Sequence, residues 1–584
     1  MSGEFDAAKT TDDAPAAHWT DVRAQMPAEF PLSDGRNAHL VFCGGELSPE
    51  DPRIRTLISS GVPCLPVLSD GTFVFIGPLY DEVTGVMPID HEVRLRAARQ
   101  NSPIRDTTRE RAPGDPVIGQ LESRMIISAV GMIMDGLAKL PGRFVGREFE
   151  LDLLALTIRI HPMLPLPNRV VAAYAGEHTW GDLVDERSGI ITHVATAHDS
   201  GVISATARIA DLSMFEPLWI DDRQGFGMST RAGKHVEAAA VSEILEAYGG
   251  FLWESTAEHL EKRNGVVSVM GKDFVSGKAR SVAASQIYLN WYRREGVMPS
   301  ASTSTNISGI AAGPSLDFAV VSALQELIER DAMTVWWLNG PVLPRRVASR
   351  ECLIRLGLLR RPGVALHFID LPSPTGVPTV VAILAGMTPN PILGFSTRHT
   401  TELAEEKAAL EALLLVRTVT GLDDPKSELW TAIIEGRVDR GALREWRQDR
   451  AYAMDFGGPH NVTDLLSQLQ YNLDPHAAAE HKHIFSGPVT EQIVGEPLAN
   501  ASVSAYRDRL GATGIEVAWV DLTPPDLALC GAYVARVVGE EFVGNAPAAF
   551  APVKSRRVVA AGIENGWRGP NEPFTPNAAP MPYA

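Results

Sequence analysis

The sequence predicts a mixed α/β protein with more than one domain. Its 584 residues exceed what a single hydrophobic core usually serves, which favours two or three domains. With 45% hydrophobic and 21% charged residues, the composition is that of a folded globular chain and not of a disordered one. In the C-terminal two thirds, strand-like and helix-like segments alternate, which is typical of one large α/β domain.

The N-terminal third contains shorter elements. Strand-like runs lie between residues 39 and 77, and a helix is expected over residues 121–140. The first residues are rich in Ala, Asp and Thr, which is typical of a loose tail. We expect four segments in all: a flexible tail at 1–35, a smaller domain at 36–178, a larger domain at 179–570 and a Pro-rich tail at 571–584.

Charge and cysteine content exclude several classes of function. The formal net charge of −18 argues against binding nucleic acid, which requires a basic surface. The four cysteines form no C-x-x-C pair, so neither a disulfide framework nor a zinc site is predicted, and a cytoplasmic protein is expected. The N-terminal residues lack the apolar stretch of a secretory signal. The apolar run "IISAVGMIM" ends at Asp135, too early for a membrane span.

Two helix-like segments each carry a pair of glutamates three residues apart. In "KHVEAAAVSEILEAY", apolar residues recur at helical spacing, and Glu243 and Glu246 lie on roughly the opposite face. In "ALQELIERDAMTVWW", Glu326 and Glu329 share a face with Arg330 next to it. The second segment is otherwise apolar nearly all round, which predicts a buried helix.

Buried carboxylates need cations, and this requirement predicts the chemistry of the site. An unpaired carboxylate inside a protein costs several kcal/mol through lost hydration. Four carboxylates brought together repel one another unless hard divalent ions lie between them. All-oxygen ligation suits Mg²⁺, which usually also keeps phosphate oxygens and water. The glutamate pairs therefore predict a Mg²⁺-bridged phosphate site built from two helices. The alternative is that both pairs lie on solvated helix faces.

The segments around these glutamates resemble the ATP-binding segments of the YcaO superfamily. They read "GFGMSTRAGKHVEAAAVSEILEAY" and "STSTNISGIAAGPSLDFAVVSALQELIERDAMTVWW". The resemblance implies ATP whose phosphates are bridged by Mg²⁺, and it implies nucleotide contacts from Arg330 and, in a third segment, from Arg417. The residues implied to hold Mg²⁺ are Glu243, Glu246, Glu326 and Glu329.

Several positions depart from the pattern of this family. Ala239 and Ala247 stand where the first segment usually has Ser and Arg, and Pro314 and Phe318 where the second usually has Asn and Glu. In the third segment, "EEKAALEALLLVR", Leu415 replaces the usual Gln. The four carboxylates are thus present, whereas several direct nucleotide contacts are not.

The N-terminal domain resembles the later half of the ThiF-like (ubiquitin-activating-type) domains found beside YcaO enzymes. The resemblance covers "VPCLPVLSDGTFVFIGPLYDEVTGVMPIDHEVRLRAARQ" and "SAVGMIMDGLAKLPGRFVGREFELDLLALTIRIHPMLPLPNR". The zinc-binding C-x-x-C pairs of those relatives are replaced here, so no zinc is expected. The adenylating loop and the leader-binding winged helix are expected to be absent, which leaves a partial domain that serves for docking.

The C-terminal tail resembles that of azoline-forming YcaO proteins, whose P-x-P-x-P-like end reaches the active site. This chain ends "AAPMPYA", with Ala578 in place of the first Pro. The resemblance places Pro580, Pro582 and Ala584 beside the reacting amide. Because the tail has no amphipathic pattern, its deletion is expected to leave stability nearly unchanged. A disordered end is the alternative.

These resemblances imply an ATP-dependent cyclodehydratase of thiopeptide-type pathways. Such an enzyme converts Cys, Ser or Thr of a ribosomally made precursor peptide into a thiazoline or oxazoline by phosphorylating the amide oxygen. The expected partners are the precursor peptide, a separate leader-binding ThiF-like protein, a flavin-dependent azoline dehydrogenase and a second copy in a homodimer. Two alternatives stay open: a degenerate YcaO scaffold without ATP turnover, and a YcaO enzyme that forms a thioamide or an amidine.

Overall fold

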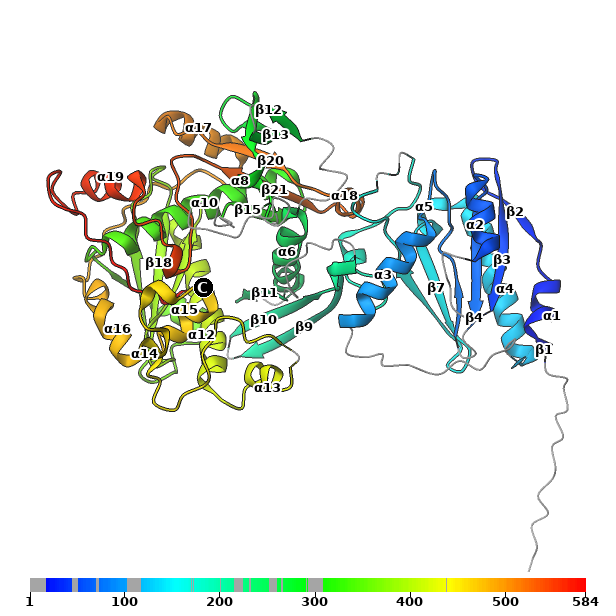
Figure 1. Cartoon of the computed structure of the whole chain (residues 1–584), viewed down its shortest axis with the longest axis horizontal. Helices are drawn as coiled ribbons and strands as arrows, with labels where there is room; N and C mark the ends of the chain where they lie inside the picture. The colour runs from blue at the N-terminus through cyan, green and yellow to red at the C-terminus, as the bar shows by residue number, and fades with distance from the viewer. Residues whose placement is uncertain are drawn as a thin grey trace, which may run out of the picture. The chain divides into compact units, whose positions relative to one another are not determined.

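The computed structural model divides into two compact units. Unit 1 comprises Met1–Thr192 and Ala210–Phe215, and unit 2 comprises His193–Ile209 and Glu216–Ala584. Both units mix helices and strands, which confirms the predicted fold class (Figure 1). The residues that the structure describes are 17–44, 51–69, 73–101, 117–169, 171, 173–199, 201–214, 224–230, 233–251, 260–263, 266–289, 291, 308–436 and 438–583.

Unit 1 is built on a six-stranded sheet with the strand order β2-β3-β4-β5-β7-β8. β3 and β4 are parallel and are joined through α2, because parallel neighbours need a crossover connection. The elements of this unit are β1 (Ala17–His18), α1 (Trp19–Ala24), β2 (Glu29–Pro31), β3 (Asn37–Gly44), α2 (Pro52–Ser59), β4 (Cys64–Ser69), β5 (Phe73–Ile76), α3 (Pro88–Asn101), β6 (Val117–Ile118), α4 (Gln120–Lys139), α5 (Pro141–Phe144), β7 (Arg147–Asp152), β8 (Thr157–Pro162), η1 (Trp180–Leu183) and η2 (Leu212–Met214).

At β5, both faces of the unit 1 sheet are covered by helices and buried side chains. Successive residues of a strand point to opposite faces. Val74 and Ile76 of β5 pack in one hydrophobic cluster with Val130 of α4. Phe75 packs in the other cluster with Ile54 of α2. The helix predicted over residues 121–140 is α4, and its apolar stripe covers the first of these faces.

The flexible tail predicted for residues 1–35 is wrong for residues 17–35. α1 and β2 lie there, and β2 pairs with β3 in the sheet. Val22 and Phe30 are buried in the unit 1 core, at 0% and 4% exposure. Two well-placed apolar side chains are enough to fold a stretch whose overall composition is polar. Residues 1–16 lie outside the described part of the chain.

A buried polar network crosses the centre of unit 1. The Tyr80 hydroxyl lies 2.7 Å from Nδ1 of His91, and Nε2 of His91 lies 3.0 Å from Oε1 of Glu148. Arg187 donates to the same carboxylate oxygen over 3.1 Å. Burial alone opposes ionisation of Glu148, but Arg187 and His91 hold its pKa below the usual value. The network therefore places a charged carboxylate in the core, where His91 and Arg187 form hydrogen bonds with it.

Breaking this network should destabilise unit 1. Glu148→Gln removes the carboxylate that is hydrogen-bonded to the buried guanidinium of Arg187 and leaves only the charges of Glu150 and Asp185 nearby, and we expect the free energy of unfolding to fall by about 3 kcal/mol. Hydrogen–deuterium exchange at β5 and β7 measures the loss directly. The control is Glu186→Gln, whose partner Arg159 is 58% exposed, and it should cost less than about 1 kcal/mol. Equal protection in both variants would show that the Glu148 network adds nothing to stability.

Within the described part of unit 2, the strands form three sheets. Their orders are β11-β10-β9, β12-β13-β20-β21-β15 with β14 paired to β13, and β16-β17-β18-β19. The strands are β9 (Ile191–Asp199), β10 (Val202–Ile209), β11 (Gln224–Ser229), β12 (Glu261–Arg263), β13 (Val266–Asp273), β14 (Ala279–Ala283), β15 (Ile310–Gly313), β16 (Arg346–Val347), β17 (Ala365–Asp370), β18 (Thr379–Ala385), β19 (Ile392–Thr397), β20 (Ala518–Asp521) and β21 (Tyr533–Val538).

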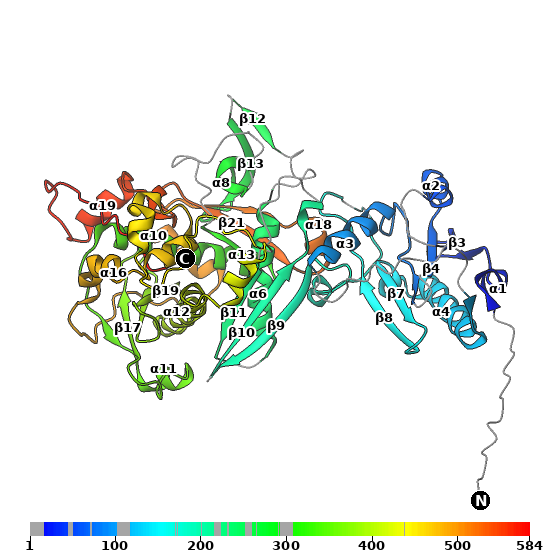
Figure 2. The same cartoon turned by 60° about the horizontal axis from the view of Figure 1, so that its bottom comes forward.

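Three long helices connect these sheets: α6, α10 and α12 (Figures 1 and 2). None of the helices in the described residues is long and apolar enough to cross a membrane. The helices of unit 2 are α6 (Lys234–Gly250), α8 (Ala284–Ile287), α10 (Leu316–Asn339), α11 (Arg350–Arg355), α12 (Thr401–Asp423), α13 (Glu428–Ile434), α14 (Tyr452–Phe456), η3 (Pro459–Asn461), α15 (Leu465–Tyr471), α16 (Pro475–His481), η4 (Lys482–Phe485), α17 (Val503–Thr513), α18 (Pro525–Leu529), η5 (Ala548–Phe550) and α19 (Arg556–Glu564).

Two glycines of β11 let α6 lie directly on the strand. A Cβ on Gly225 would stand 2.0 Å from the carbonyl oxygen of Ala240, and one on Gly227 would stand 2.3 Å from that of Val236. No other residue type fits at either position, because backbone atoms of the helix cannot move aside. This close approach fixes the height of α6, and with it Glu243 and Glu246, above β11.

α10 is the most deeply buried long helix of the unit. Ser315 caps its N-terminus by accepting a hydrogen bond from the N–H of Phe318, and Gly340 ends it in the left-handed conformation. It packs against β15 and β21 on one side and against β19 on another. The burial predicted from its sequence is confirmed, since Leu324 and Trp336 have no exposed surface.

Candidate active site

One strand holds a carboxylate from each of the two glutamate helices. The N–H groups of Gly309 and Ile310 donate to Oε2 of Glu326 over 2.9 and 3.0 Å. The N–H of Ala312 donates to Oε1 of Glu246 over 3.3 Å. The start of β15 thus provides backbone donors to both pairs, because it packs against α6 and α10 together.

The other member of each pair bonds to a different strand. Glu243, which is exposed, accepts a 2.5 Å hydrogen bond from the N–H of Phe226 on β11. Glu329, whose side chain is 6% exposed, accepts one of 3.1 Å from the N–H of Thr397 on β19. All four predicted glutamates therefore carry at least one backbone hydrogen bond, and each helix spans two strands through its pair.

The carboxylates repel one another. Burial raises the pKa of Glu246 well above its usual value, and the charges of Glu326 and Glu243 raise it further. Burial also raises the pKa of Glu326, although Arg330 opposes the shift. For Glu329 the rise in pKa comes from burial and then from the charge of Glu411 on α12. Negative charge has accumulated here beyond what the protein's own cations neutralise.

Arg330 is the cation that links the two glutamates of α10. Its guanidinium lies 3.7 Å from Oε1 of Glu326 and 3.7 Å from Oε1 of Glu329. The neighbouring Asp331 serves a different purpose, because its carboxylate is fully buried, pairs with Arg557 of α19 at 2.7 Å and accepts from the N–H of Val543. Of the four charged residues between Glu326 and Asp331, three belong to the candidate site and Asp331 anchors α19.

The donor set fits Mg²⁺ by its chemistry. Carboxylate oxygens are the ligands that this ion prefers, and a divalent cation would relieve the repulsion around Glu246. Among the residues that the structure describes, however, no three His, Cys, Asp or Glu side chains converge as ligands of a metal ion. The glutamate side chains must therefore turn away from some of their N–H partners to share an ion.

The structure places Arg417 away from these hydrogen bonds. Its guanidinium donates to the hydroxyl of Ser204 on β10. Ser204 lies opposite Met228 of β11, two positions along the register from the Phe226 pair that reaches Glu243. Arg417 thus fixes α12 against the β10–β11 hairpin. Its predicted contact with the nucleotide stays a prediction.

The C-terminal tail is packed in unit 2 as far as the structure describes it. Met581 and Tyr583 are 6% and 4% exposed and join a cluster with Trp336 and Phe395. The expectation that this tail buries little apolar surface is therefore wrong. Apolar side chains that alternate with prolines pack it against unit 2. The end of the chain lies beside α12 in both views (Figures 1 and 2).

The tail is recognised through its carbonyl groups. Proline has no N–H, so Pro580 and Pro582 offer only acceptors. Nδ2 of Asn472 donates to the carbonyl of Pro580 over 2.9 Å, and the N–H of Leu393 donates to that of Pro582 over 3.2 Å. Both prolines are buried, and their predicted place beside the reacting amide stays a prediction. Ala584 lies outside the described residues.

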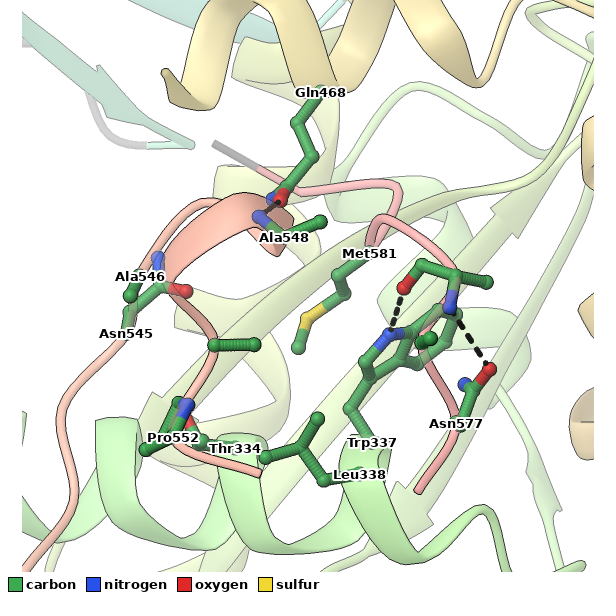
Figure 3. A pocket seen from close by; sticks show the side chains of 13 residues that line it. Thr334, Trp337, Leu338, Gln468, Asn545, Ala546, Ala548, Pro552, Asn577 and Met581 are labelled. Atoms are coloured by element: carbon green, nitrogen blue, oxygen red, sulfur yellow. Dashed lines mark hydrogen bonds between the residues drawn. The ribbon is translucent and has the colours of Figure 1, made fainter. Parts of the chain in front are cut away.

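A small, partly open pocket lies beneath the tail (Figure 3). Trp337 of α10 forms part of its wall, and its indole N–H donates to the carbonyl of Ala579 over 2.7 Å. Asn577 accepts a hydrogen bond from the N–H of Ala579 at the rim. Small side chains, Ala546, Ala548 and Ala551 among them, line the opposite wall. The tail thus crosses α10 one turn beyond the charged residues and forms one side of this pocket.

Tyr583 is the tail residue that reaches the charges, and sequence reasoning missed it. Its ring centre lies 5.2 Å from the guanidinium carbon of Arg330, and its hydroxyl lies 3.5 Å from Oε2 of Glu411. Its position in a tail already expected at the site, as the one aromatic residue of "AAPMPYA", was the available signal. The backbone donors of β15 carried no such signal.

Residues 237–542 match the family described as YcaO cyclodehydratase, ATP- and Mg²⁺-binding. Because this match covers more than half of the chain, the protein belongs to the YcaO family. The family description names Mg²⁺, which the paired glutamates predicted, and ATP, which the family resemblance implied. A search of curated proteins returned no match.

Two solved structures share the fold. A heterocyclase in complex with substrate and cofactor has a TM-score of 0.62 and 16% identity, over 97% of this chain and 83% of its own. The heterocyclase TruD has a TM-score of 0.53 and 15% identity, over 94% of this chain and 79% of its own. At such identity the likeness concerns the fold. That unit 1 is a ThiF-like remnant stays a prediction.

Removing the tail should cost stability. Deletion of residues 578–584 exposes the cluster that Met581 and Tyr583 cover, and we expect the free energy of unfolding to fall by about 3 kcal/mol or more. Met581→Ala should reproduce part of the loss, and Glu572→Gln, an exposed position, should reproduce none. Urea denaturation provides the measurement. An unchanged midpoint in the truncated protein would instead support the alternative that the C-terminal tail is disordered.

Proposed function

We propose that this protein is an ATP-dependent cyclodehydratase that forms azolines from Cys, Ser or Thr of a ribosomally made precursor peptide. The observation that carries the proposal is the set of neighbouring, partly buried carboxylates on α6 and α10, with Arg330 among them and the C-terminal tail packed against that arginine. The fold likeness to heterocyclases supports it.

Each group of the site has a role in this proposal. The four glutamates hold Mg²⁺, and Arg330 balances the charge that remains between Glu326 and Glu329. The backbone donors of β15 keep Glu246 and Glu326 oriented when no ion is bound. ATP with Mg²⁺ supplies the phosphoryl group that turns the amide oxygen into a leaving group. Orienting charge in a partly buried site is how proteins generally favour such a transfer.

The tail contributes shape and exclusion of water. Pro580 and Pro582 restrict the backbone, so the tail loses little entropy when it docks. The aromatic cluster of Trp336, Trp337 and Phe395 closes the site behind it. The side-chain thiol or hydroxyl attacks the carbon of the preceding amide, the former carbonyl oxygen accepts the phosphoryl group of ATP, and phosphate leaves as the ring forms. A wall that excludes water limits transfer of the phosphoryl group to water. The resemblance of the tail to that of azoline-forming relatives favours ring formation over the thioamide and amidine chemistries.

The direct test is ATP turnover with a leader-bearing candidate precursor peptide rich in Cys, Ser and Thr. The wild type should release phosphate and remove one water from the peptide for each ring. Glu326→Gln and Glu243→Gln should lower both rates at least about 100-fold, because each removes a charged ligand. The control Glu402→Gln, exposed on α12, should keep both rates. Ring formation at the wild-type rate in either site variant would refute the assignment of these glutamates.

A scaffold without ATP turnover is the second candidate. Phe318, at a position where the family usually has a carboxylate, is 53% exposed at the start of α10. Within the described residues, the acidic side chains also form no ready ligand set. This candidate gains support if the protein binds precursor peptide while no phosphate is released with any peptide of the gene cluster.

A separate leader-binding ThiF-like protein is the proposed partner, with unit 1 as the docking surface. β8 is an edge strand whose Ile158 and Ile160 are 44% and 57% exposed, and Leu154 in the preceding turn is 82% exposed. Apolar residues on an open strand edge are typical of a surface that another chain covers. A flavin-dependent azoline dehydrogenase and a homodimer remain part of the proposal.

Cyclisation should therefore depend on the partner supplied in trans. We expect rings to form at least about ten times faster with the partner than without it, because leader binding raises the local concentration of substrate. The double variant Leu154→Ser, Ile160→Ser should lose this gain. Met454→Ser, equally exposed but in unit 2, should keep it. Full-rate cyclisation by the isolated chain on a leader-bearing peptide would remove the docking role.

A further inference from the structure

Tyr583 contacts four separate elements of unit 2. Its ring lies over Arg330 of α10 and meets Phe395 of β19 edge to face, with ring centres 5.0 Å apart. Its hydroxyl faces Glu411 of α12, and its carbonyl accepts from Nε2 of Gln468 on α15. A side chain that is contacted on three sides, on a backbone that is itself held by Gln468, has one orientation, so it can impose an orientation on a neighbour.

Arg330 is the neighbour whose orientation depends most on this ring. A long, flexible guanidinium has several rotamers, and its two carboxylate contacts of 3.7 Å are too long to be hydrogen bonds. The aromatic face adds the attraction that fixes the guanidinium in place. A cation within about 6 Å of a ring centre is attracted to the ring, and more strongly where water is excluded. Tyr583, at 4% exposure, provides such a place.

We propose that Tyr583 is a positioning residue whose ring holds Arg330 between Glu326 and Glu329, so that the end of the chain sets the affinity of the site for Mg²⁺ and nucleotide. The hydroxyl serves a separate purpose. It directs a donor at Glu411, which also pairs with Lys407 at 3.7 Å, and so keeps α12 beside α10. The inference rests on the proposed function for the identity of the ligand, but not for the contact itself.

The environment of Tyr583 keeps it neutral. Burial raises the pKa of the phenol well above its usual value, and nearby Glu411, Glu329 and Glu326 add to the rise, while Arg330 opposes it. The hydroxyl therefore remains a donor to Glu411, and the ring remains a neutral face for Arg330. Tyr583 is thus suited to orient charges and not to exchange a proton.

Three tail variants separate positioning from packing. Tyr583→Phe keeps the ring, Tyr583→Leu removes it, and Met581→Ala disturbs the same buried cluster without touching Arg330. The readout is the dissociation constant of a non-hydrolysable ATP analogue with Mg²⁺, measured by calorimetry. We expect Tyr583→Leu to weaken binding about tenfold and Tyr583→Phe less than about threefold. Met581→Ala should lower the melting temperature but leave the affinity unchanged.

Two outcomes would overturn the proposal. Unchanged affinity in Tyr583→Leu would show that the ring does not position Arg330. Equal weakening in Met581→Ala would show that the tail acts through general packing alone.

A second measurement tests the contact without any nucleotide. Urea midpoints are compared for the wild type, Tyr583→Leu, Arg330→Gln and the double variant. If the ring acts through Arg330, the shift of the double variant is smaller than the sum of the single shifts. Additive shifts would overturn the proposal. A wild type that binds no Mg²⁺-nucleotide while the shifts remain non-additive would refute the proposed function and leave the positioning contact standing.

Discussion

The burial of charge on α10 is the constraint on which much of unit 2 depends. An unpaired charge inside a protein costs several kcal/mol, so every charged residue of this helix requires a partner. Asp331 forms an ion pair with Arg557 of α19, and Glu329 accepts a hydrogen bond from the backbone of β19. Arg330 meets the ring of Tyr583. The charged residues of α10 thus hold α19 and the C-terminal tail, which are distant in sequence, against this one helix.

Unit 1 meets the same constraint in a different way. Glu148 is enclosed by His91 and Arg187, and its pKa is held low, so the network is complete without a ligand. The pKa of Glu246 is raised first by burial and then by the charges of Glu326 and Glu243. An added cation would relieve both effects, which makes this group of carboxylates a candidate for binding an ion.

The tail shows how a segment without regular structure acquires a fixed place. Its two buried prolines limit the backbone and offer only carbonyl acceptors, which the side chain of Asn472 and the N–H of Leu393 satisfy. Met581 and Tyr583, each of which follows a proline, fill the aromatic cluster. Order here comes from matching acceptors with donors and from burial, and not from a repeating hydrogen-bond pattern.

The sequence by itself determined the fold class, the two glutamate helices, the burial of α10 and the family, because helical periodicity and short motifs are local properties. Only the tertiary structure decided that Val22 and Phe30 are core residues, that Asp331 is structural and that Tyr583 reaches Arg330. These depend on contacts between residues far apart in the chain. Periodicity cannot predict them, because the sequence around a single charged or aromatic residue does not indicate which distant residue it will contact.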